Sequence, residues 1–178
     1  MSNLSANYLD NTRKIFAYYK SLGEKAFEQV SPNRINWYFH NDSNSIAIIV
    51  KHMSGNLKSR FTDFLSSDGE KTWRHRDEEF VDDIIDAEQM RAVWESGWKV
   101  LFDTLDSLTP ADMDKTVIIR GEEHTVVEAL NRQLTHHAYH VGQIVFLSKM
   151  LATDWHSLSI PKGGSAAFNS SMEEKAKA

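Results

Sequence analysis

The stretch TVVEALNRQLTHHAYHVGQIVFLSKML, residues 125–151, decides the fold of this chain. Thr125 and Glu128 have the spacing of a capping box, in which each side chain accepts a hydrogen bond from the backbone N–H of the other residue. A helix is therefore predicted to begin there and, with no proline to interrupt it, to run for about seven turns. The apolar residues recur at the spacing of one helix face. They are Val126, Leu130, Leu134, Val141, Ile144, Val145 and Leu151.

Three histidines, His136, His137 and His140, lie in the middle of this helix. Residues four apart project from the same face of a helix, so His136 and His140 can direct ring nitrogens at one point. That is the spacing by which a helix binds a transition metal, although a short pattern also arises by chance. By helical phase, His137 and His140 could equally be the two metal ligands on this helix. Because His137 lies nearest the centre of the apolar face, it is more simply explained as a core imidazole.

The composition limits the classes of function. A chain of 178 residues is expected to form one domain with a hydrophobic core. Its 20 lysines and arginines are scattered among 25 acidic residues, for a net charge of −5, which argues against nucleic-acid binding. No cysteine is present, so a metal must be bound by nitrogen and oxygen. Without a hydrophobic signal core or a run of ~20 apolar residues, we expect a cytoplasmic protein that does not bind membranes.

Three further helices are predicted, over residues 4–29, 45–65 and 86–107. The segment from Thr116 to Thr125, with Gly121 at its centre, indicates a small β-hairpin. Four long amphipathic helices and one hairpin predict an all-α fold, a four-helix bundle formed as a single domain by residues 1–165. Residues 166–178 are predicted to be a partly disordered tail.

The second helix carries one more histidine. His52 lies at the edge of its apolar face, where a partly exposed histidine is expected, and Asn56 follows one turn later. In the connection from 66 to 85, charges of both signs alternate as on a solvated surface. There His75 stands between two arginines, which disfavour a bound cation, so His75 is not expected to be a ligand. The aromatic loop from Trp37 to His40 is expected to pack on the helices; the alternative is the lid of a pocket.

These features together resemble the DinB/YfiT-like superfamily. The motif consists of a histidine in the second predicted helix, His52, and of HHAYHVGQ, residues 136–143, in the last helix. The resemblance covers nearly the whole chain. It includes the stretches NSIAIIVKHMSGNLKSRFTDFLSSDGEKTWRHRDEEF and LSIPKGGSAAFN. It implies an up-down-down-up four-helix bundle, usually homodimeric. It also implies a divalent metal on His52, His136 and His140, because the last ligand of the family precedes the x-G-Q element. The chain departs from the pattern at Val141, where many members have an arginine.

The activities of that superfamily imply a function. Characterised members are transferases that use bacillithiol, mycothiol or glutathione, together with some related maleylpyruvate isomerases. A metal held only by imidazoles keeps open positions and can ionise a bound thiol or water. The order of metal affinities favours zinc or nickel. We therefore expect a metal-dependent transferase with a low-molecular-weight thiol as partner; the alternatives are a metal-dependent hydrolase and a non-catalytic metal-binding or dimerisation protein. The five tryptophans and nine phenylalanines also favour a homodimer.

Overall fold

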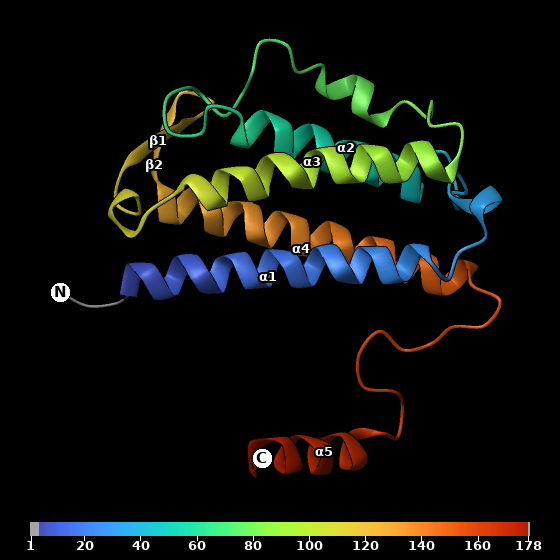
Figure 1. Ribbon diagram of the computed structural model, residues 1–178. Coiled ribbons are helices and arrows are strands. Elements are labelled where there is room, and N and C mark those ends of the chain that lie inside the picture. Colours follow the sequence, from blue (N-terminus) through green and yellow to red (C-terminus); the bar gives the residue numbers. More distant parts are fainter. Residues whose placement is uncertain (1–3, 178) are drawn as a thin grey trace.

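The computed structural model describes residues 4–177 and is mostly helical. Four long helices lie side by side: α1 (Leu4–Phe27), α2 (Ile46–Phe61), α3 (Ala87–Ser107) and α4 (Val126–Leu151). Following the colours along the chain, α1 and α4 run in one direction, and α2 and α3 run in the opposite direction (Figure 1). Short 3-10 helices lie in the connections: η1 (Pro32–Arg34), η2 (Arg76–Phe80) and η3 (Pro110–Asp112).

Three of the long helices, α2, α3 and α4, begin at a capping side chain, at the positions where the sequence predicts their starts. The side chain of Ser45 accepts a hydrogen bond from the backbone N–H of Ile48, and that of Asp86 accepts one from Gln89. At the start of α4, Thr125 and Glu128 form the complete capping box. These contacts satisfy N–H groups that have no partner inside the helix.

The apolar faces of the four helices form one hydrophobic core. Phe16, Trp94 and Leu130 are among its most buried side chains. Close contact between α2 and α3 depends on Gly97, because a Cβ at this position would lie 2.7 Å from the Cα of Ser54. A side chain at this position would push the two helices apart.

The predicted hairpin is present as β1 (Thr116–Ile119) and β2 (Glu122–Thr125), paired antiparallel with Ile119 opposite Glu122. Its turn residues, Arg120 and Gly121, have φ values of 57° and 76°. Two positive φ angles in succession are typical of the tight turn that matches the twist of a hairpin. The carboxylate of Asp68 accepts hydrogen bonds from both turn N–H groups, at 2.8 Å each, and so fixes the turn on the connection after α2.

Two helix ends differ from the prediction. The first helix ends at Phe27 and the second at Phe61, whereas the sequence predicts ends at 29 and 65. In the second, the apolar period continues through Phe64, which is buried, but Thr62 is extended and Asp63 has a φ of 50°. Phe64 therefore reaches the core from a turn, which periodicity alone does not distinguish from a helix.

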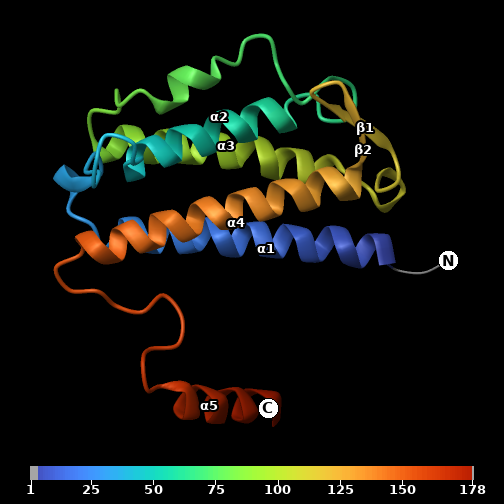
Figure 2. The same cartoon turned by 180° about the vertical axis from the view of Figure 1, so that it is seen from behind.

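The C-terminal segment contains a helix that the sequence did not predict, α5 (Ser165–Lys177). It lies apart from the four long helices in both views (Figures 1 and 2). Among the residues described, no helix combines the length and apolar character needed to cross a membrane. In the aromatic loop, Trp37 packs against the core, whereas Phe39 is 73% exposed.

Candidate metal centre

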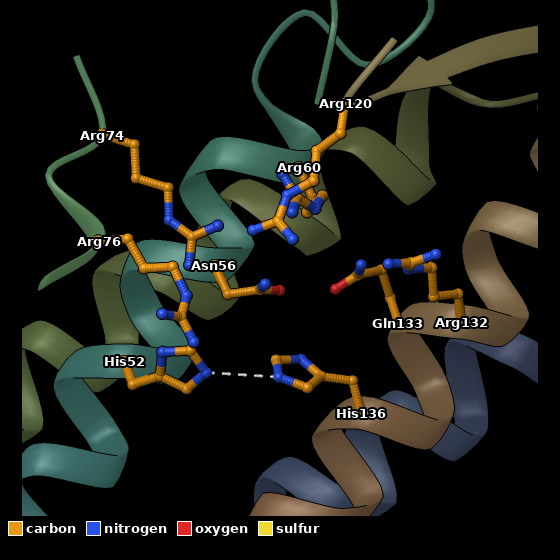
Figure 3. A pocket seen from close by; sticks show the side chains of 9 residues that line it. All are labelled: His52, Asn56, Arg60, Arg74, Arg76, Arg120, Arg132, Gln133 and His136. Carbon is orange, nitrogen blue, oxygen red and sulfur yellow. Dashed lines mark hydrogen bonds between the residues drawn. The ribbon is translucent and has the colours of Figure 1, made fainter. Parts of the chain in front are cut away.

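Three imidazoles from two helices converge in the middle of the molecule. On α4, His136 and His140 lie one turn apart, with 3.1 Å between their Nε2 atoms. His52 faces them from α2, with its Nε2 3.4 Å from Nε2 of His136 (Figure 3). One ring nitrogen from each of the three lies within 4.8 Å of the other two. His75 is not part of this group.

The spacing of these nitrogens fits a single metal ion. Tetrahedral zinc with Zn–N bonds of about 2.0–2.1 Å places its ligand nitrogens roughly 3.3 Å apart. The separations from Nε2 of His136 to those of His140 and His52, 3.1 and 3.4 Å, lie on either side of that value. His52, His136 and His140 could therefore hold one metal ion.

The outer ring nitrogens have partners that fix two of the tautomers. Nδ1 of His52 lies 2.9 Å from a carboxylate oxygen of Glu79, and Nδ1 of His140 lies 2.8 Å from the amide oxygen of Gln143. The Gln143 amide N–H donates in turn to the hydroxyl of Tyr139, at 3.1 Å. Since both partners are acceptors, each Nδ1 carries the proton and each Nε2 keeps a free lone pair that points at the common centre.

Glu79 is the residue of the site that the sequence analysis missed. The expectation that residues 66–85 form a solvated surface is wrong here, because Glu79 is 6% exposed and the side chain of Arg74 only 2%. Arg74 donates two hydrogen bonds to Glu79, at 2.8 and 3.0 Å. Burial opposes ionisation of Glu79, but the hydrogen bonds from His52 and Arg74 outweigh it and lower the pKa of the carboxyl group. Glu79 is therefore a carboxylate that orients His52.

No sequence signal marks Glu79, since it is one acid among several. It contacts α2 only because the connection between α2 and α3 folds back over α2. Figure 1 shows that connection passing over α2 and α3. Asn56, the partner suggested by sequence, has no hydrogen bond to a histidine ring among the described residues, and its amide oxygen is buried without a hydrogen bond. His52 itself is 6% exposed, and not partly exposed as predicted, because Phe80 covers its ring at 5.0 Å between centroids.

Burial favours the neutral form of His136 and His140. It is the largest influence on His136 and, with the neighbouring histidines, lowers the pKa of that ring to about 3. Burial likewise lowers the pKa of His140. Neutral rings are the form in which histidine binds metals, so neither His136 nor His140 has to lose a proton at neutral pH.

His137 is fully buried, as its helical phase predicts. Its ring packs edge-on against Phe16 and Trp98, with centroid separations of 6.3 and 5.7 Å. Neither ring nitrogen has a hydrogen-bond partner among the described residues. His137 is a core residue and does not belong to the group that could hold a metal.

A cavity of about 190 Å³ borders the histidines. We call it the arginine cavity, because five arginines line it together with His52, His136 and the amides of Asn56 and Gln133. No residue of the Trp37–His40 loop lines it, so the structure does not place that loop as its lid. The arginines are Arg60, Arg74, Arg76, Arg120 and Arg132.

Comparison with models of protein families identifies the family of this chain. A family model described as "Protein of unknown function (DUF1572)" matches residues 3–164, most of the chain. No curated protein matches the sequence.

Proposed function

We propose that this chain, which belongs to the DUF1572 family, is an enzyme that depends on one divalent metal ion bound by His52, His136 and His140. The observation that carries the proposal is the convergence of three Nε2 atoms, with 3.1 and 3.4 Å between neighbours. The acceptors on Nδ1 of His52 and His140 support it, because they hold both lone pairs toward the same point. Three imidazoles without a shared cation would gain little from this arrangement.

Zinc or nickel is the ion that we propose. All three donors are imidazoles, which suit both metals, and the order of affinities for nitrogen ligands places nickel and zinc above manganese and iron(II). When bound, such an ion supplies Lewis acidity, which favours the deprotonated form of a thiol or water at its open positions.

The arginine cavity supports an enzyme over a storage or structural protein. It borders His52 and His136, so a small molecule that enters it comes next to the proposed ion. A purely structural site is normally closed by its fourth protein ligand. Among the described residues, no further histidine or acid joins the three-histidine group.

We further propose that the substrate is a low-molecular-weight thiol, which the enzyme transfers to an electrophile. This rests on the resemblance to DinB/YfiT-like proteins, supported by the four long helices, of which α1 and α4 run against α2 and α3 as in an up-down-down-up bundle. In the reaction, the thiol sulfur forms a bond to an electrophilic carbon, the leaving group departs with its electron pair, and the thiol proton passes to solvent. With no cysteine in the chain, no internal sulfur competes for the site.

The thiol step is tested on protein loaded with nickel or cobalt. Bacillithiol, mycothiol and glutathione are titrated separately while sulfur-to-metal absorption and conjugation to a generic electrophile are followed. One thiol should produce both signals, and His140→Ala should abolish both. If no thiol alters the spectrum and conjugation stays at the level of His140→Ala, the thiol proposal fails, and hydrolysis or metal binding without turnover remains.

A homodimer is proposed as the assembled form. The outer face of α4 exposes Tyr139, Phe146 and Met150, each at least half accessible. On α5, Phe168 and Met172 are also exposed. Apolar side chains at this density on neighbouring turns are typical of surfaces that contact another chain.

A further inference from the structure

The arginine cavity gathers positive charge from four separate parts of the chain. Arg60 comes from α2, Arg120 from the hairpin turn and Arg132 from α4. Arg74 and Arg76 come from the connection after α2, at the start of η2. Figure 3 shows these side chains extending toward the space above His52 and His136. Since their segments are distant in sequence, the fold itself brings the cations together.

Nearby acids do not balance these charges. Glu70 pairs with Arg60 at 3.1 Å and Arg120 at 2.8 Å, while Glu79 pairs with Arg74. Asp68 is also near, but its carboxylate accepts hydrogen bonds from backbone N–H groups, including those of Arg120 and Gly121. Five arginines thus face three carboxylates, and no acid lines the cavity. This excess of positive charge occurs in a chain whose net charge is −5.

Several polar atoms at the cavity are buried and have no hydrogen-bond partner, although Nη1 of Arg74 lies 3.8 Å from a carboxylate oxygen of Glu70. They include Nε of Arg60 and Nη1 of Arg74, whose side chains are 4% and 2% exposed. The amide oxygens of Asn56 and Gln133 are also unpaired, and either amide can turn to present its N–H groups instead. Leaving such groups without a partner is unfavourable, and a bound anion would satisfy the guanidinium donors.

The two remaining arginines are free to bind a ligand. Neither Arg76 nor Arg132 has a side-chain hydrogen bond or ion pair with the residues that the structure describes, and both are exposed. Arg76 is held in place by Phe80, with its guanidinium 5.2 Å from the ring centroid. Because Phe80 also covers His52, this arginine is positioned directly beside the proposed metal site.

We infer that the arginine cavity binds a ligand with at least two negative charges, as a dicarboxylate or a phosphate group, beside His52 and His136. The planar guanidinium group matches the oxygens of both in paired hydrogen bonds. The inference rests on the proposed function in one respect only: the anionic group is taken to be part of the electrophilic substrate or of the thiol. Binding of the anion itself requires no metal.

The test measures binding of inorganic phosphate and of malonate to metal-free protein by calorimetry, in a buffer free of other multivalent anions. Both anions should saturate at one site per chain, and the tighter of the two identifies the class of ligand. Acetate, with a single charge, should bind more weakly than malonate. Raising the salt concentration should weaken binding, since Arg76 and Arg132 are exposed to solvent.

Two variants locate the site. Arg76→Gln and Arg132→Gln each remove one guanidinium that supports no other described polar contact, so the fold should persist; each should weaken binding about tenfold. Arg91→Gln is the matched control, because Arg91 is exposed on α3 and does not line the cavity. The inference is overturned if neither anion saturates, or if all three variants bind as the wild type does.

Failure of this inference is distinguishable from failure of the proposed function. His140 does not line the cavity, so His140→Ala should lose metal but keep its affinity for phosphate or malonate. A wild-type protein that binds an anion but no metal would refute the proposed function and leave the inference standing. Metal binding without anion binding would refute the inference alone.

Discussion

At the scale of single residues, the contact between His52 and Glu79 links the candidate metal site to the connection after α2. The carboxylate accepts the Nδ1 proton of His52 and is itself held by two hydrogen bonds from Arg74. Such outer contacts fix the direction of the lone pair and increase the basicity of the ligand. The affinity for metal should therefore depend on a residue that does not touch the ion.

We predict that Glu79→Gln weakens metal affinity by about 10- to 100-fold, the usual effect of mutating a hydrogen-bond partner of a histidine ligand. The amide keeps the approximate shape but loses the negative charge that His52 and Arg74 share. Competition with a chromophoric chelator measures the change. Glu78→Gln is the control, since Glu78 is exposed on the same short helix. Equal affinity for Glu79→Gln and wild type would remove Glu79 from the site.

A second residue-scale prediction concerns His137→Leu. Both ring nitrogens of His137 are buried without partners, and an unpaired buried polar group costs about 1–3 kcal/mol. Leucine should therefore leave metal content unchanged and raise the free energy of unfolding by about 1 kcal/mol. Metal analysis and urea denaturation check the two effects. Loss of metal by a folded His137→Leu protein would show that the wrong pair on α4 has been chosen.

At the scale of elements, the approach of η2 to α2 depends on Gly55. A Cβ built at this position would lie 2.6 Å from the carboxyl carbon of Glu79. The absence of a side chain therefore lets the carboxylate lie against the helix beside His52. The glycine weakens the helix, since alanine is the better helix former by about 1 kcal/mol.

We predict that Gly55→Ala lowers metal affinity about tenfold. The added methyl group displaces the carboxylate of Glu79, and a lost contact of this kind to a histidine ligand weakens metal binding by at least that factor. Gly142→Ala is the matched control, because Gly142 lies in α4 and a Cβ there would meet nothing within 4 Å. The control should stabilise the fold by up to ~1 kcal/mol and leave metal affinity unchanged. If both alanine variants bind metal as the wild type does, η2 does not set the orientation of His52.

The elements show what sequence can and cannot predict. Helix starts were predictable because the caps at Ser45, Asp86 and Thr125 are local hydrogen bonds. The position of His137 followed from helical phase alone. Glu79 and the arginine cavity were not predictable, because they form where the connection after α2 meets α2, α4 and the hairpin. Contacts at that separation leave no periodic signal in the sequence.

At the scale of the whole molecule, the proposed homodimer makes a direct prediction. Light scattering at tens of micromolar protein should give twice the mass of one chain. Replacing Phe146, which is 65% exposed on α4, by aspartate should shift the mass toward a monomer. The same substitution at Phe39, 73% exposed in the aromatic loop, is the control and should leave the mass unchanged. A monomer for the wild type would contradict the proposal.

The most direct test of the whole account is the metal content of protein purified without a histidine tag and dialysed against metal-free buffer. Elemental analysis by mass spectrometry should find one zinc or nickel ion per chain. The ion should be absent from folded His52→Ala and His140→Ala, and present in His40→Ala, whose histidine is exposed in the aromatic loop. If the wild type retains no divalent metal, or if His140→Ala retains as much as the wild type, the three histidines are not a metal site.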